Sequence, residues 1–311
     1  MGMTAPLLEP QYKKSIRIIN VWSSNLEFEF ERIAFASRCF PFVTIDTEFP
    51  GVVFHPTVDS ANPKNTSRPL DRYRALKANV DSLHLIQLGL TLSDLDGNLP
   101  DFGGGCSFVW QINFKEFDVS SDLHAPDSIN LLRQQGIKFD KNREDGVDST
   151  RFAELMLASG LVFYNTPLFR WVTFHGAYDF AYLLKAITRQ PLPDDLNGFY
   201  KLLNVYFGLK IYDVKQMLKF CDGVFGGLER VAKTYGLKRI GEAHCAGSDS
   251  LLTWFVFHKL LLNNNVKGAG VLFGLDIDYK PAPVIRFMAP VPPQHAYCSV
   301  LRMPAIPGMF G

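Results

Sequence analysis

The sequence predicts an α/β fold that forms one large domain, or at most two. Hydrophobic residues make up 47% of the 311 residues, which is enough to bury a sizeable core. Apolar and polar residues alternate in several short segments of the first half, as they do in β-strands, and strand patterns then alternate with helix patterns further along. Such an alternation is typical of a sheet flanked by helices.

The first predicted helix covers residues 20–38 and leads into a strand at residues 41–50. Apolar residues recur at helical spacing in the helix, and Asn20 is available as its N-cap. The strand, PFVTIDTEFP, carries two acids. Because side chains alternate along a strand, Asp46 and Glu48 share one face, about 6 to 7 Å apart. They either bind a divalent cation or face water on an edge strand, and this segment alone leaves both interpretations open.

The middle of the chain adds two strands and three helices. Residues 51–69 are rich in Pro, Asn and Ser, which indicates a long loop of the kind that often borders a substrate. Strands are expected at residues 83–92 and 107–114, with turn residues between them, so that three antiparallel neighbours form with residues 41–50. The helices are expected at residues 70–82, 127–135 and 148–161, with Asp148 or Ser149 as a cap of the last.

Residues 171–184 combine a short apolar strand, a turn with glycine and a helix. Asp179 falls in the first turn of that helix, where the macrodipole favours an anion and lowers its pKa. This position suits a metal ligand as well as an ordinary helix-start acid.

Another helix is expected at residues 196–207, before a short strand at 209–213. Asp213 ends that strand and suits an N-cap better than the margin of a site. A helix follows at 226–238, and the basic residues near its end suit a solvated surface better than a grip on phosphate: Lys233, Lys238 and Arg239.

A glycine-bearing loop then enters an apolar helix that runs to about Leu262. His244 lies five residues before Asp249. The loop can therefore present an imidazole while the N-terminus of the helix presents a carboxylate. A single histidine in a loop is usually incidental, but this one lies next to the fourth acid of a possible set.

Composition excludes several classes of protein. Lys and Arg number 32 against 31 for Asp and Glu, so any contact with nucleic acid must be local. The five cysteines are scattered without C-x-x-C spacing, which argues against a disulfide framework or a zinc site and favours a reducing compartment. The sequence shows no signal peptide, myristoylation signal or transmembrane run, so no membrane contact is expected.

Together these motifs resemble the three exonuclease motifs of the DEDD superfamily, histidine subtype. The motifs are D-x-E on a strand, Tyr-Asp at a helix start and H-x4-D before a late helix. The local sequences IDTEFPG, FHGAYDFAYLLK, IYDVK and HCAGSDSLLT are similar to those of Caf-type poly(A) deadenylases, catalytic subunits of the CCR-NOT complex. The resemblance covers about residues 16–264, and the combination is far more specific than any single motif.

The resemblance implies an RNase H-like fold with a mixed sheet flanked by helices in a single domain. It also implies that Asp46, Glu48, Asp179 and Asp249 hold two divalent metal ions, Mg²⁺ or Mn²⁺, and that His244 is the general base. The implied reaction is 3′-to-5′ exonucleolytic release of AMP from mRNA poly(A) tails. Residues 1–15 are expected to be an N-terminal extension and residues 265–311 a Pro-rich, irregular tail.

Two alternatives stay open at this point. One is a DEDD nuclease that acts on DNA or structured RNA, and the other is an RNase H-fold scaffold without turnover, against which the complete acid set argues. The implied partners are poly(A) RNA, the CCR-NOT scaffold subunit, a companion deadenylase and BTG/Tob-type regulators. The implied location is the cytoplasm and the nucleus.

Overall fold

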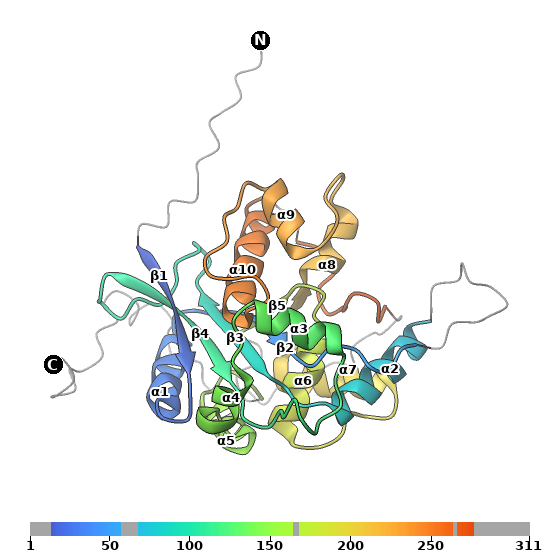
Figure 1. The fold of residues 1–311 in the computed structure, drawn as a ribbon. Coiled ribbons are helices and arrows are strands. Elements are labelled where there is room, and N and C mark those ends of the chain that lie inside the picture. The colour runs from blue at the N-terminus through green and yellow to red at the C-terminus, as the bar shows by residue number, and fades with distance from the viewer. Residues whose placement is uncertain (1–13, 57–67, 164–167, 264–265, 277–311) are drawn as a thin grey trace, which may run out of the picture.

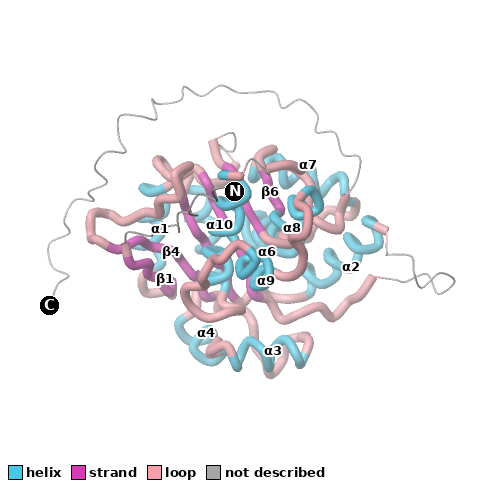
Figure 2. Tube along the Cα trace, turned by 90° about the horizontal axis from the view of Figure 1, so that it is seen from above, coloured by secondary structure: helices cyan, strands magenta, loops and turns pink. Residues whose placement is uncertain are grey.

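The computed structural model describes residues 14–56, 68–163, 168–263 and 266–276. Six strands of these segments form one mixed sheet in the order β1-β4-β3-β2-β5-β6. They are β1 (Ser15–Val21), β2 (Phe42–Glu48), β3 (Gln87–Ser93), β4 (Cys106–Asn113), β5 (Arg170–Thr173) and β6 (Ile211–Asp213). The neighbours β2, β3 and β4 are antiparallel, whereas β1 with β4, β2 with β5 and β5 with β6 are parallel. Figure 2 shows β1 and β4 toward one edge and β6 at the other.

Helices cover both faces of the sheet (Figure 1). α10 crosses β2 and β3 on one face, with α8 and α9 beside it, while α1, α2, α5, α6 and α7 cover the opposite face. The helices are α1 (Leu26–Ala36), α2 (Pro69–Ser82), α3 (Pro126–Gln134), α4 (Phe139–Asp145), α5 (Ser149–Ala158), α6 (Ala177–Thr188), α7 (Leu196–Phe207), α8 (Val214–Met217), the 3₁₀ turn η1 (Leu218–Phe220), α9 (Leu228–Thr234) and α10 (Ala246–Leu262).

Strand β2 divides its side chains between two hydrophobic cores. Val43 and Ile45 are buried in the larger core, under α1, α2, α5, α6 and α7. Phe42 is buried in the smaller core, which α10 covers. Because side chains alternate along a strand, Asp46 and Glu48 follow Phe42 on the α10 side. The acids therefore lie where α10 crosses the sheet.

The predicted α/β fold, with a mixed sheet flanked by helices, is confirmed. β2, β3 and β4 are the three antiparallel neighbours that the alternating patterns predict. The long loop expected over residues 51–69 lies partly outside the described residues. No helix in the described part of the chain has both the length and the apolar composition that a membrane span needs.

The expected start of the first helix was wrong. Asn20 lies in strand β1, and α1 begins only at Leu26, after Asn25. The Asn25 side chain holds the turn between them, because its amide oxygen accepts from the Trp22 N–H at 2.8 Å and its amide nitrogen donates to the Asn20 carbonyl oxygen. Segment β1 pairs in parallel with β4, which lies far along the chain. Its own pattern could not reveal that partner.

Residues 266–276 contain no helix or strand, yet they pack against the domain. Leu272 and Leu275 are buried in the larger core. The Tyr200 hydroxyl accepts from the Leu272 N–H and donates to the Leu275 carbonyl oxygen. The start of the expected tail therefore belongs to the folded domain, while residues 1–13 and 277–311 lie outside the described residues.

Candidate active site

The first turn of α10 packs against the sheet, and side chains of the strands cap it. The amide oxygen of Gln87 accepts from the Ala246 N–H at 3.4 Å, and that of Gln111 accepts from the Gly247 N–H at 3.1 Å. A hydrogen bond of 2.9 Å between the hydroxyls of Thr91 and Ser250 joins the same helix to β3. These contacts satisfy N–H groups that a helix start leaves without partners. They also fix Asp249 opposite the acids of β2.

Asp179 approaches β2 from the start of α6. One of its carboxylate oxygens accepts from the Thr47 N–H at 3.0 Å and from the Thr47 hydroxyl at 2.5 Å. Burial raises the pKa of Asp179 to about 7, although the two bonds from Thr47 act in the opposite direction. The lowered pKa expected from the helix macrodipole was therefore wrong, because loss of hydration outweighs the dipole.

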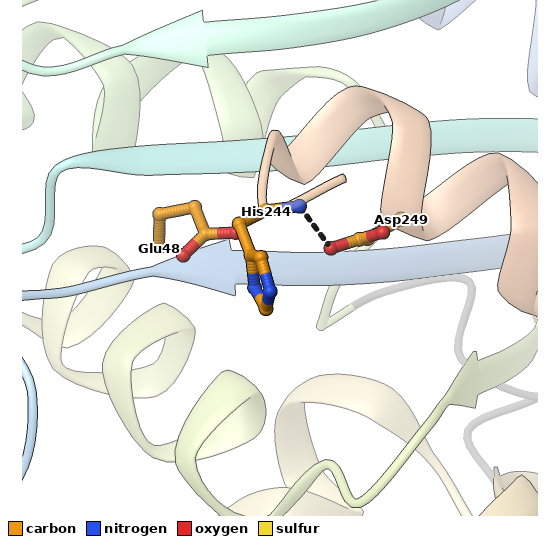
Figure 3. A group of neighbouring side chains, drawn as sticks. All are labelled: Glu48, His244 and Asp249. Carbon is orange, nitrogen blue, oxygen red and sulfur yellow. Dashed lines mark hydrogen bonds between the residues drawn. The ribbon is translucent and has the colours of Figure 1, made fainter. Parts of the chain in front are cut away.

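His244 and Asp249 meet Glu48 at the other side of the cluster. The Asp249 carboxylate accepts from the His244 backbone N–H at 3.1 Å (Figure 3). His244 has a left-handed backbone with a φ of 56°, a conformation that few residues other than glycine adopt. One potential ligand atom from each of Glu48, His244 and Asp249 lies within 4.8 Å of the others. This spacing lets the three side chains share one small cation.

The cluster concentrates negative charge away from water. Burial, followed by repulsion from Asp249 and Asp179, raises the pKa of Glu48 to about 8. Burial also raises the pKa of Asp46, with further contributions from Asp179, Asp249 and Glu48. The pKa of Asp249 is likewise raised by burial, although the guanidinium of Arg239 lowers it. Carboxylates in this arrangement ionise together only when a cation lies among them.

The structure thus brings together all the acids that the sequence proposed for the site, with His244 beside them. Asp213 has a different place, since its side chain caps α8 and accepts from the Lys215 N–H at 2.9 Å. It also accepts from the backbone N–H groups of His175, Gly176 and Phe273. Asp213 therefore ties the loop before Asp179 to residues 266–276, as a structural anchor.

Two residues near the cluster have a role that the sequence did not predict. Arg239 forms an ion pair with Asp249, whereas Lys233 and Lys238 are exposed as expected of a solvated surface. Cys245 lies close enough to Glu48 and Asp249 for their charges to act on its thiol, whose pKa is raised to about 11, mainly by burial. Its sulfur approaches the Gln135 carbonyl oxygen at 3.6 Å. Gln135 and Glu48 are remote from Cys245 in sequence, so no local pattern indicates those contacts.

The sequence is similar to those of several known proteins. The sequence model described as "CAF1 family ribonuclease" matches residues 21–155. The chain is 48% identical over 269 residues to the "Probable CCR4-associated factor 1 homolog 7" of Arabidopsis thaliana, covering 85% of this chain and 95% of that protein. It is 44% identical over 245 residues to the "Poly(A) ribonuclease pop2" of Schizosaccharomyces pombe, covering 78% and 69%.

Solved structures show the same likeness. The Schizosaccharomyces pombe Pop2p structure in its Mg²⁺- and Mn²⁺-bound form superposes with a TM-score of 0.74 at 42% identity, over 84% of this chain and 99% of that one. A yeast CAF1 co-crystallised with the NOT1 MIF4G domain gives a TM-score of 0.66 at 30% identity, over 86% and 100%.

Proposed function

Because the chain belongs to the CAF1 family of ribonucleases, it is a poly(A) exoribonuclease, and we propose that the acid cluster described above is its active site. One observation carries this assignment. Asp179 of α6 is hydrogen-bonded to Thr47, which lies between Asp46 and Glu48 of β2, and Glu48 lies beside Asp249 of α10 and His244. A purely structural role gives no reason to bury this many acids together.

The donor set fits divalent metal ions. Carboxylate oxygens are the ligands that Mg²⁺ and Mn²⁺ prefer, and the buried acids need positive charge in order to ionise. Asp46, Glu48, Asp179 and Asp249 would hold the ions, and a metal cofactor is supported by the Mg²⁺- and Mn²⁺-bound form of the Pop2p relative. Bound there, two divalent ions would supply electrostatic stabilisation of the attacking and leaving oxygens of a phosphodiester.

The protein's own groups prepare the reaction. His244 is exposed at the edge of the cluster, where its imidazole can accept the proton of the attacking water. Its backbone N–H holds Asp249, and Thr47 holds Asp179, so that both carboxylates keep fixed directions. Attack on the 3′-terminal phosphodiester of a poly(A) tail then releases 5′-AMP, and successive cycles shorten the tail in the 3′-to-5′ direction.

Digestion of a labelled RNA tests the proposal. The substrate carries a 5′ label and a 3′ oligo(A) tail, and products are resolved on a gel with Mg²⁺ or with EDTA. We expect a ladder that shortens by single nucleotides with Mg²⁺, AMP as the released product, and no cleavage with EDTA or with Asp46→Ala. Asp140→Ala, an exposed acid of α4, is the matched control and should leave the ladder unchanged.

Three results would overturn the assignment. Full activity of Asp46→Ala would remove the acid cluster from the mechanism. Equal digestion of oligo(A) and oligo(dA) would favour a DNA-directed or structured-RNA nuclease, because a contact with the 2′-hydroxyl separates RNA from DNA. Absence of AMP release under every metal condition would favour the other alternative, an RNase H-fold protein that binds partners without catalysing a reaction.

The same family membership supports docking onto a NOT1-type CCR-NOT scaffold, as the yeast CAF1 complex indicates for that relative. A companion deadenylase, BTG/Tob-type regulators and a location in both cytoplasm and nucleus are part of the proposal, and they rest on the resemblance of the motifs. Co-purification with a NOT1 MIF4G domain tests the docking onto NOT1, and we expect the two proteins to bind. No binding by the folded, active enzyme would contradict it.

A further inference from the structure

Arg239 is an inward-facing cation at the edge of the acid cluster. Its side chain is only 14% exposed, and one of its terminal nitrogens donates both to the Asp249 carboxylate and to the Ser248 hydroxyl. At the other end, the Nε and the second terminal nitrogen each lie 2.9 Å from the Glu229 carboxylate. The guanidinium therefore bridges an acid of the cluster and an exposed acid of α9.

The charge of Arg239 reaches beyond Asp249. It acts on Asp46 and Glu48 as well, and in both cases it opposes the repulsion among the acids. The guanidinium thus neutralises part of the negative charge of the cluster, as a divalent ion would, and it does so at the same carboxylate, that of Asp249. Two positive groups that serve one carboxylate repel each other, so each weakens the other's interaction with it.

We propose that Arg239 is a built-in counterion that stabilises the cluster without metal and competes with divalent metal for Asp249. The inference deepens the proposed function, since it rests on the metal site assigned there. Arg239 is a positioning residue under this proposal, because it acts through Asp249. Its contacts with Glu229 and Ser248 allow it to keep hydrogen-bond partners when Asp249 turns toward a metal ion.

A purely orienting role of Arg239 predicts the opposite change in metal affinity when the residue is removed. If Arg239 only fixed Asp249 in the direction that a metal requires, its removal would weaken metal binding. If it competes, its removal tightens binding while the metal-free protein becomes less stable, because the acids then lack their nearest cation. Metal affinity and metal-free stability therefore move in opposite directions only for a counterion.

The experiment compares the full chain with the variants Arg239→Gln and Arg239→Lys. Arg151→Gln is the matched control, since Arg151 also bridges two acids, Glu27 and Glu154, on the exposed surface of α5. The melting temperature is measured in EDTA and then over a series of Mg²⁺ concentrations, which gives an apparent Kd. Measurement at about pH 8.5 limits competition between protons and metal for the carboxylates.

We expect Arg239→Gln to lower the melting temperature in EDTA by roughly 2–6 °C. We expect it to tighten the apparent Kd for Mg²⁺ roughly 5- to 30-fold. Arg239→Lys retains the charge and should stay close to wild type in both measurements, as should Arg151→Gln. If Arg239→Gln does not fold, Arg239→Met, which also removes the charge, takes its place.

Weaker or unchanged Mg²⁺ binding by the folded, uncharged variant would overturn the counterion proposal, and so would equal tightening by Arg239→Lys. Either outcome leaves the proposed function intact, because the wild-type protein still binds metal. Absence of Mg²⁺ binding by the wild-type protein would be a different failure. It would remove the proposed metal site, and the counterion proposal with it.

Discussion

Gly89 and Ala246 approach each other so closely that a Cβ on Gly89 would lie 1.8 Å from the Ala246 carbonyl oxygen. Gly89 pairs with Asp46 across β2 and β3, while Ala246 begins α10. The absence of a side chain at this one position of β3 therefore lets the helix that carries Asp249 rest beside the strand that carries Asp46.

Gly89→Ala should consequently reduce both stability and activity. The added methyl group meets backbone rather than a flexible side chain, so α10 has to move, at a cost of about 2–3 kcal/mol in the free energy of unfolding. Urea denaturation and RNA digestion measure the two effects. Gly104→Ala is the control, because a Cβ there meets only ordinary contact at 3.7 Å. Wild-type activity in Gly89→Ala would show that the close approach is unnecessary.

His244→Ala should lower kcat by roughly 10²- to 10⁴-fold, the usual contribution of a general base. Because the His244 backbone N–H holds Asp249, the variant retains that hydrogen bond and should remain folded. Digestion of the labelled RNA at saturating substrate measures kcat. A folded variant with wild-type kcat would assign His244 a role other than proton transfer.

The acid cluster should make the metal-free protein less stable as the pH rises from about 5 to about 8. The pKa of Glu48 is raised from 4.5 to about 8 and that of Asp179 from 3.8 to about 7. In this window the folded protein binds more protons than the unfolded chain, so the free energy of unfolding falls with increasing pH. The stability contributed by protonated Glu48 and Asp179 is thus fully present near pH 5 and is lost as the pH rises toward about 8.

Urea denaturation in EDTA at several pH values measures this slope. Asp46→Asn removes one charge from the cluster and should give a shallower slope, with a more stable protein at about pH 8. Mg²⁺ should reverse the loss at the alkaline end, because the ionised carboxylates then have cations. A metal-free wild-type protein that gains stability through the window would contradict the burial of the cluster.

Asp213→Ala should destabilise the protein by about 3 kcal/mol, although the residue lies outside the proposed chemistry. Its carboxylate accepts four backbone N–H groups, from His175, Gly176, Lys215 and Phe273, and is fully buried. Asp195→Ala is the matched control. Asp195 caps α7 through the single Gly198 N–H, and its loss should cost about 1 kcal/mol. Equal losses in the two variants would refute the anchoring role of Asp213.

The sequence indicated features that depend on near neighbours. The alternation in β2 placed Asp46 and Glu48 on one face, and Asp148, the N-cap of α5, was one of the two caps expected from position, Asp148 or Ser149. Features that depend on remote partners were not accessible. Gln87 and Gln111 cap a helix more than a hundred positions away. The pKa of Asp179 is raised by burial, although its position at a helix start predicted a lowered pKa. No local sequence pattern shows how deeply the side chain is buried.

The order in which the chain is synthesised gives the docking of α10 a further consequence. A polypeptide that has left the ribosome as far as α7 contains Asp46, Glu48 and Asp179, but neither His244 nor Asp249. The complete set exists only after the last described helix has been translated and has settled on β3. If the proposed site is correct, a nascent chain that ends before α10 lacks His244 and Asp249 and has no complete site with which to shorten a tail.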